Sequence, residues 1–318
     1  MTVRSTLAAA GVNQVTFEHL RTLLRRAGQQ ESLNYIATNR LLPRQLVTRF
    51  FGWFSQIEQP LVRDLSLATW RMFTDLDLSD AATQEFASLH ACFIRELAPG
   101  ARPVDADPDT VTSPCDGIVV MCGQVEGTRL YQVKGSSYEL SELLVDPAYA
   151  EQFRDGCYVT LRLTSAMYHR LHAPYDSTIE HVTYVAGDTW NTHPATLQRV
   201  PKLYCKNERA ILRARLRPSG QPLAIVPVAA ILVASIRLHF LDVLLHLKHA
   251  GPNELPCQAD ASKGEELGYF QHGSTVVMFA PAGFRLAAGI EPGSHVRMGQ
   301  ALLRLPALAR LSDCSPSS

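Results

Sequence analysis

The sequence lacks paired cysteines and lacks a net charge. Its seven cysteines are an odd number, and none stand as a C-x-x-C pair. A disulfide framework or a zinc site is therefore not expected, and the thiols should be reduced, as in a cytosol-like compartment. The 30 basic residues are balanced by 30 acidic residues, so the overall charge predicts no nucleic-acid partner.

A long apolar run is also absent. The longest mainly apolar stretch, "LAIVPVAAILVASI" at 223–236, has 14 residues and contains Pro227 and Ser235. A membrane-spanning helix needs about 18 or more consecutive apolar residues. This stretch therefore predicts buried strands rather than a membrane span.

The first part of the chain predicts helices. One broad helical face carries Leu46, Val47, Phe50, Phe51 and Phe54, and Trp53 and Trp70 are added nearby. Residues 35–73 contain five arginines and only two acidic residues. Arginine beside aromatic residues on an amphipathic helix suits a membrane interface. From this stretch alone, packing against the protein's own core is an equally good explanation.

The character of the chain changes after "APGARPVDADPDT" at 98–110. Short apolar runs bounded by Gly, Pro and Asp follow, including "GIVVMCGQV", "CYVTLRL" and "STVVMFA", and these predict strands. Ser79 is predicted to cap a helix before this point, and the tail "GSHVRMGQALLRLP" predicts a hairpin. The sequence thus predicts an α+β protein with an N-terminal helical region, 1–98, and a mostly antiparallel, sandwich- or barrel-like β-rich domain, 99–318.

One predicted strand is interrupted by polar residues. The stretch "YFQHGSTVVMF" at 269–279 places Gly273, Ser274 and a threonine between two apolar runs. A bulge or turn is the ordinary explanation, because glycine allows unusual backbone angles and the hydroxyls bond to nearby backbone. Two other stretches combine reactive residues with turn residues, namely "SPCDGIVV" with Asp116 and "MYHRLHAPYD" with His169 and His172.

These residues permit more than one kind of site. The H-x-x-H spacing of His169 and His172 is compatible with a metal, but no cysteine or carboxylate cluster nearby completes such a site. A serine, a histidine and an aspartate far apart in sequence are also what an acyl-transfer triad needs. Most proteins of this size contain such a trio, so these residues alone leave the chemistry open.

The motifs "SPCDG", "YHRLHAP" and "GYFQHGSTVVMF" occur here in an order and spacing that resemble the phosphatidylserine decarboxylase family. The similarity extends to "CFIRELAPGARPVD", "YQVKGSSYELSELL", "VAGDTWNTHPATLQRVPKLYCKNER" and "KGEELGYF", and it covers about residues 33–305. His272 is a departure, because leucine is frequent in the family at that position. The Gly-Ser-Thr itself is intact.

The resemblance implies that the chain cuts itself between Gly273 and Ser274. The Ser274 hydroxyl would attack the Gly273 carbonyl and form an ester, and loss of the α-proton would then expel the Gly273 carboxylate. Hydrolysis of the resulting dehydroalanine gives ammonia and a pyruvoyl group, a covalent cofactor derived from Ser274. The chains 1–273 and 274–318 are expected to remain associated.

The resemblance also implies the roles of the other site residues. His172 is expected to be the base for self-cleavage, Asp116 to orient and stabilise it, and His169 to act nearer the substrate. The substrate amine would form a Schiff base with the pyruvoyl carbonyl, which serves as an electron sink while the carboxylate leaves as CO₂. This chemistry needs no metal.

The expected reaction converts phosphatidylserine to phosphatidylethanolamine. Since each CH₂ of a lipid moved into water costs about 0.8 kcal/mol, the enzyme should dock on the membrane, and residues 35–73 are the expected docking surface. We expect a peripheral protein on the cytoplasmic face of the inner or cell membrane, or on an organelle membrane in a eukaryote. The sequence leaves a homodimer open.

Two alternatives remain at this stage. An uncleaved hydrolase would use Asp116, His172 and an intact Ser274 to cleave esters, and it would consist of a single 318-residue chain. An inactive lipid-binding relative would keep the three motifs without using them. The length of the mature chain separates the first alternative from the decarboxylase.

Overall fold

The computed structural model describes residues 44–131, 137–217, 219–231, 235–246, 251–271 and 275–307. Helices come first: α4 (Arg44–Phe54), α5 (Pro60–Phe73) and α6 (Leu89–Phe93). Proline suits the start of α5 because its missing N–H would be unpaired there in any case.

The helix predicted from Ser79 is wrong. The Asp77 side chain accepts from the Ser79 N–H over 2.9 Å and closes a turn, and the next helix is capped by Ser88 instead.

The remaining elements are mostly strands. In chain order the strands are β1 (Thr110–Thr112), β2 (Gly117–Gln124), β3 (Arg129–Tyr131), β4 (Ser137–Glu139), β5 (Cys157–Arg162), β6 (Arg170–His172), β7 (Ser177–Val185), β8 (Arg209–Leu216), β9 (Pro222–Val228), β10 (Ser235–Leu238), β11 (Val243–His246), β12 (Glu254–Ala261), β13 (Glu266–Phe270), β14 (Thr275–Ala280), β15 (Arg285–Leu286), β16 (His295–Val296) and β17 (Ala301–Arg304). Four short helices lie between them: α7 (Leu140–Leu144), α8 (Pro147–Glu151), α9 (Pro194–Leu197) and α10 (Leu203–Lys206).

The strands form open antiparallel sheets. The largest has eight strands in the order β12-β7-β8-β9-β14-β5-β2-β16, and a four-stranded sheet has the order β11-β10-β13-β6. Smaller sheets are β1-β17-β15 and β3-β4. The predicted tail hairpin is wrong, because β16 pairs with β2 whereas β17 pairs with β1 and β15. The predicted α+β class with a mostly antiparallel body is confirmed, and within the described residues the sheets do not close into a barrel.

Strand β14 runs through the centre of the hydrophobic core. Successive side chains of a strand point to opposite faces, and Val276 and Met278 enter one core cluster while Val277 and Phe279 enter another. The first cluster joins the large sheet to the four-stranded and three-stranded sheets, and the second joins it to α7, α8 and α10. Burial on both faces explains why "TVVMFA" is apolar without alternation.

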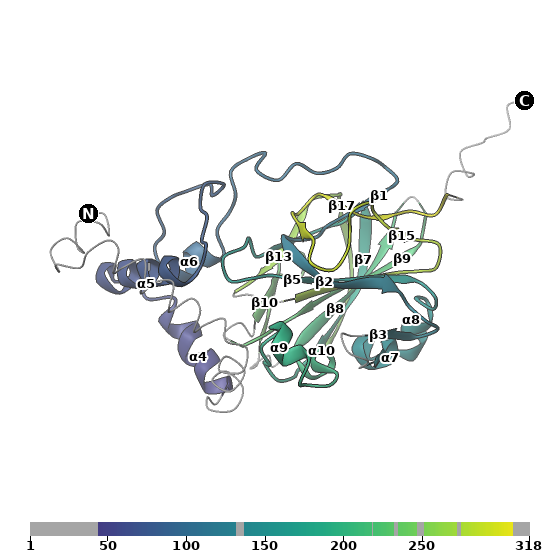
Figure 1. Ribbon diagram of the computed structural model, residues 1–318, viewed down its shortest axis with the longest axis horizontal. Helices are drawn as coiled ribbons and strands as arrows, with labels where there is room; N and C mark the ends of the chain where they lie inside the picture. Colours follow the sequence, from purple (N-terminus) through teal and green to yellow (C-terminus); the bar gives the residue numbers. More distant parts are fainter. Residues whose placement is uncertain are drawn as a thin grey trace, which may run out of the picture.

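The helices α4, α5 and α6 stand beside the β-rich body, at the opposite end from α7 and α8 (Figure 1). Helix α5 has no buried residue, although its sequence is largely apolar. Among the described residues, no helix is both long enough and apolar enough to cross a membrane. Residues 1–43, which include the first part of the predicted docking segment 35–73, lie outside the described residues, and the division at residue 98 stays a prediction.

Candidate active site

The predicted cleavage site lies in the connection between two sheets. Strand β13 ends in the four-stranded sheet and β14 begins in the eight-stranded sheet. At one end the Gln271 N–H donates to the Ser235 carbonyl over 3.3 Å, and at the other end Thr275 is paired with both β5 and β9. His272, Gly273 and Ser274 themselves lie outside the described residues. The described ends of this connection, Gln271 and Thr275, contact strands of different sheets.

His169 lies beside this connection. The Phe270 N–H donates to the His169 carbonyl over 3.0 Å, so the histidine is opposite the last residue of β13. Its imidazole is fully buried and its ring centroid lies 4.0 Å from that of Phe93 in α6. The predicted substrate-side histidine is thus held between the β-rich body and the N-terminal helices.

His172 is buried at the other end of the same strand pair, opposite Glu266. Its Nδ1 lies 2.9 Å from the Gly264 carbonyl oxygen and its Nε2 lies 2.9 Å from the Tyr168 hydroxyl. Because a carbonyl only accepts, Nδ1 carries the proton and Nε2 accepts from Tyr168. Burial lowers the pKa of His172 below its ordinary value, since desolvation disfavours the imidazolium. The result is a neutral imidazole whose Nε2 lone pair faces a hydroxyl.

Asp116 is held by an arginine that sequence reasoning did not single out. Arg102 Nε and Nη2 donate to the Asp116 carboxylate over 2.9 and 2.7 Å, and the Met298 N–H donates to it over 2.9 Å. Arg102 also donates to Asp80 over 2.8 Å. Within the described residues, the hydrogen bonds of Asp116 go to these groups rather than to His172. The predicted orientation of His172 by Asp116 stays a prediction.

The segment that carries Asp116 nevertheless contacts the histidine strand directly. The His172 N–H donates to the Pro114 carbonyl over 2.8 Å, and the Thr112 N–H donates to the Pro174 carbonyl over 2.9 Å. The "SPCDG" and "YHRLHAP" motifs therefore lie side by side, and β13, which leads to the third motif, pairs with β6. The structure brings together three motifs that are far apart in the sequence.

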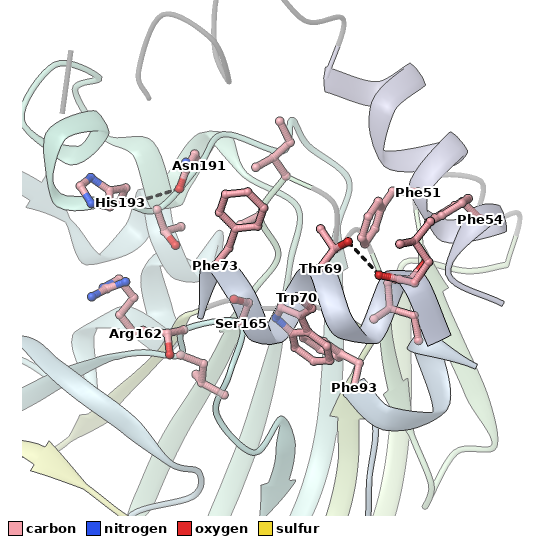
Figure 2. Close-up of a pocket in the computed structure, with 18 residues that line it drawn as sticks. Phe51, Phe54, Thr69, Trp70, Phe73, Phe93, Arg162, Ser165, Asn191 and His193 are labelled. Atoms are coloured by element: carbon pink, nitrogen blue, oxygen red, sulfur yellow. Dashed lines mark hydrogen bonds between the residues drawn. The ribbon is translucent and has the colours of Figure 1, made fainter. Parts of the chain in front are cut away.

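A cavity of about 670 Å³ lies between the N-terminal helices and the β-rich body. Its apolar wall includes Phe51, Phe54, Trp70 and Phe93 from the helices, and the Phe93 ring is the one that contacts His169. Figure 2 shows a second group of side chains on the other side of Phe73, made up of Arg162, Asn191 and His193. The cavity therefore has an apolar end next to α4 and α5 and a polar end on the β-rich body.

Sequence reasoning missed the polar end of this cavity. Asn191 and His193 belong to the quoted family stretch at 185–209, but no chemistry singled them out. A signal was present for Arg162, which is the only charged residue of "CYVTLR" in β5. A charge at the end of an otherwise buried strand is uncommon and marks a position that needs a polar partner.

Comparison with known proteins accounts for this arrangement. Residues 89–304 match the model of a family described as phosphatidylserine decarboxylase. A phosphatidylserine decarboxylase proenzyme of Methylococcus capsulatus is 35% identical over 275 residues, which cover 82% of this chain and 93% of the relative. Proenzymes of the same name from Shewanella baltica and Pseudomonas fluorescens are each 35% identical, over 85% and 86% of this chain and over 96% and 98% of those relatives. Because the match spans every strand of the body and all three motifs, the chain belongs to the phosphatidylserine decarboxylase family.

Proposed function

We propose that this protein is a self-cleaving phosphatidylserine decarboxylase, which converts phosphatidylserine to phosphatidylethanolamine and CO₂. The observation that carries the proposal is that β13, which leads to Gly273-Ser274, pairs with β6 and contacts His169, so the segment with both histidines lies beside the described end of β13. The membership of the family supports the reaction. An intact Gly-Ser pair in this place supports self-cleavage.

Cleavage at this point would leave both chains in one fold. Residues 274–318 would begin at β14, which is hydrogen-bonded between β5 and β9 in the middle of the large sheet. The same fragment contributes β16 to β2 and β17 to β1. Thr275, the residue after the proposed cleavage site, would therefore stay paired with Arg162 after the peptide bond is lost.

The surroundings of the connection fit a pyruvoyl group formed from Ser274. When present, such a group supplies an electrophilic carbonyl that accepts the electrons released as CO₂ leaves. The buried, fixed end of β14 would keep that carbonyl in one orientation. His169 is buried at the same end of the strand pair, which supports its proposed role of holding or returning a proton there.

His172 has the properties of the base that self-cleavage requires. A serine hydroxyl is a weak nucleophile until a base accepts its proton, and Nε2 of His172 already accepts a hydrogen bond from a hydroxyl. The Gly264 carbonyl fixes the tautomer through Nδ1. In this proposal Asp116 acts by holding Arg102 and the 113–117 segment against the histidine strand.

The helices α4 and α5 are the proposed membrane-docking surface. Among the described residues, large apolar side chains that are exposed are concentrated there: Leu46, Phe50 and Trp53 on α4, and Leu61, Leu65 and Phe73 on α5, with Val145 as the exception. An apolar surface of this kind marks an interaction site. Because the same helices line the apolar end of the cavity, a lipid could pass from the membrane to the site without entering water. We propose a peripheral protein on the cytoplasmic face of the cell membrane.

Intact-mass analysis under denaturing conditions tests the proposal. The purified protein should separate into chains 1–273 and 274–318, and the smaller chain should lack a free amino terminus. Ser274→Ala should give one uncut, inactive chain, because no hydroxyl is present to attack or to be eliminated. A single full-length chain in protein that releases CO₂ from phosphatidylserine would reject the pyruvoyl mechanism. A single chain that cleaves esters would favour the Asp-His-Ser hydrolase.

A further inference from the structure

Arg162 lines the polar end of the cavity without an anionic partner. It is the last residue of β5, its Nε is fully buried, and within the described residues that Nε has no acceptor and the guanidinium forms no ion pair. Burial lowers the pKa of the guanidinium from its ordinary value, yet arginine stays protonated in proteins. The Arg162 side chain is half-buried, and an anion bound there would provide the charged hydrogen bonds that the described residues do not.

Other buried arginines of the protein are matched to acceptors. The Arg209 guanidinium donates to four backbone carbonyl groups, and Arg102 is shared between two aspartates. Arg170 donates to Glu266 and to the Ile94 carbonyl. The Nε atoms of Arg95 and Arg213 also lack an acceptor, but both of these guanidinium groups donate through their Nη atoms. Among the described residues, Arg162 differs because no part of its guanidinium has a hydrogen-bond acceptor.

Arg162 also lies beside the cleavage connection. It is the direct antiparallel partner of Thr275, the residue after Ser274, and Cα atoms of such partners are about 4.5–5.5 Å apart. In Figure 2 its guanidinium is on the same side of Phe73 as His193, away from Phe51, Phe54 and Trp70. An anion bound to Arg162 would lie between the reacting end of β14 and the apolar end of the cavity.

We propose that Arg162 binds the phosphodiester group of the lipid substrate. The proposal rests on the proposed function, because that function defines the substrate. In phosphatidylserine the phosphate separates the amino-acid head from the acyl chains. A phosphate at Arg162 and acyl chains along the aromatic wall would direct the amino-acid head toward Thr275, the strand partner of Arg162 and the residue after Ser274. Guanidinium and phosphate also match in geometry, since two parallel N–H groups can meet two oxygens.

The substrate carboxylate is the less suitable partner. It leaves as CO₂, so an ion pair with it would stabilise the ground state more than the transition state and would slow the reaction. The phosphodiester does not react and stays anionic throughout. An interaction that is equal in both states lowers KM and leaves kcat unchanged.

Kinetics with dihexanoyl phosphatidylserine below its micelle concentration tests this assignment. Arg162→Gln should be cut like the wild type and should raise KM by at least about tenfold, the loss expected for a charged hydrogen bond, while kcat changes less. Dihexanoyl phosphatidylglycerol has the phosphodiester but neither the amine nor the carboxylate. It should inhibit the wild type competitively and inhibit Arg162→Gln at least about tenfold less well. Arg285→Gln, which removes an exposed arginine on β15, is the charge-matched control and should behave as the wild type.

Several outcomes would overturn the assignment. A KM for Arg162→Gln equal to that of the control would overturn it. A raised kcat of Arg162→Gln with unchanged inhibition by phosphatidylglycerol would also overturn it, because that result would place the substrate carboxylate at Arg162. If Arg162→Gln is not cut, inhibition of the wild-type enzyme is the test. Dihexanoylglycerol lacks the phosphodiester, so phosphatidylglycerol that inhibits the wild type no better than dihexanoylglycerol would exclude a phosphate site. A wild type that is uncut and releases no CO₂ would instead reject the proposed function.

Discussion

The Phe270 N–H donates to the carbonyl oxygen of His169, so this histidine and the end of β13 are fixed neighbours. His172 is paired with Glu266 at the opposite end of the same strand pair. The two histidines of the "YHRLHAP" motif therefore face different ends of one short strand pair. The two side chains therefore have different surroundings, and substitutions can test whether they serve different steps.

Single substitutions of the histidines should separate those steps. His172→Ala is expected to leave an uncut chain, because the Nε2 that accepts a hydroxyl proton is lost. His169→Ala is expected to be cut at least partly and to release CO₂ at a rate lower by about 10²–10⁴-fold. Chain length on a denaturing gel and CO₂ release should be measured on the same samples. An uncut His169→Ala beside a normally cut His172→Ala would reverse the two roles.

The rate of self-cleavage should not fall at mildly acidic pH. Burial lowers the pKa of His172 below its ordinary 6.5, so its imidazole is still the neutral, proton-accepting form at pH 6.5. Cell-free synthesis of the chain at pH 6.5 and at pH 8, followed by gel electrophoresis over time, should give rate constants that differ by clearly less than about twofold. A rate that halves at pH 6.5 would place the pKa of the base at its ordinary value and exclude the buried imidazole.

Loss of the exposed aromatic residues of α4 should release the protein from membranes. Phe50 and Trp53 are more than half exposed, at 59% and 64%, and each buried aromatic side chain stabilises binding by about 1.5–3 kcal/mol. Phe50→Ser with Trp53→Ser should weaken sedimentation with lipid vesicles by at least about tenfold and should leave self-cleavage intact. Val145→Ser, at an exposed valine outside these helices, is the control. If the double variant sediments as fully as the control, the docking surface lies elsewhere.

Strand β13 should tolerate no side chain at Gly268. A Cβ at this position would lie 1.9 Å from the Arg237 carbonyl oxygen of β10, far inside contact distance. Gly268→Ala should push the two strands apart, displace the connection to β14 and yield an uncut chain. Gly52→Ala meets no atom within 4 Å and should be cut normally, with stability raised by about 0.5–1 kcal/mol in the helix. Normal cutting of Gly268→Ala would show that the position of β13 does not control the cleavage site.

The stability of the protein should depend on pH through Glu208. This carboxyl is fully buried and accepts one hydrogen bond from the Tyr184 hydroxyl, and burial raises its pKa from 4.5 to about 7. The folded state therefore keeps the proton that the unfolded state loses, and stability falls as pH rises from about 4.5 to 7. Glu208→Gln removes this loss, so its free energy of unfolding relative to the wild type should increase by up to about 3 kcal/mol between pH 5 and pH 8. Urea unfolding at both pH values measures the difference, and a difference that stays constant with pH would exclude a neutral buried Glu208.

Part of this protein could be predicted from its sequence. The apolar runs "CYVTLRL" and "STVVMFA" became β5 and β14, because a run of that length and composition is stable only when it is buried in a sheet. The amphipathic helices α4 and α5 were likewise visible in the spacing of their aromatic residues. The three motifs that contain Asp116, the two histidines and Gly273-Ser274 were found from their order along the chain. The errors at Ser79 and at the tail hairpin came from local patterns that a turn and distant strands overrode.

The sequence by itself determined which chemical groups are present and which peptide bond is the proposed cleavage site. Only the tertiary structure decided how those groups are paired. Asp116 is bound to Arg102 and His172 to Gly264 and Tyr168, while Arg162 faces a cavity whose described lining contains no acidic residue. These pairings depend on which strands become neighbours in the sheets. No local propensity records that choice, because it is made by the burial of the whole core, and contacts between distant segments form only when the complete fold is assembled.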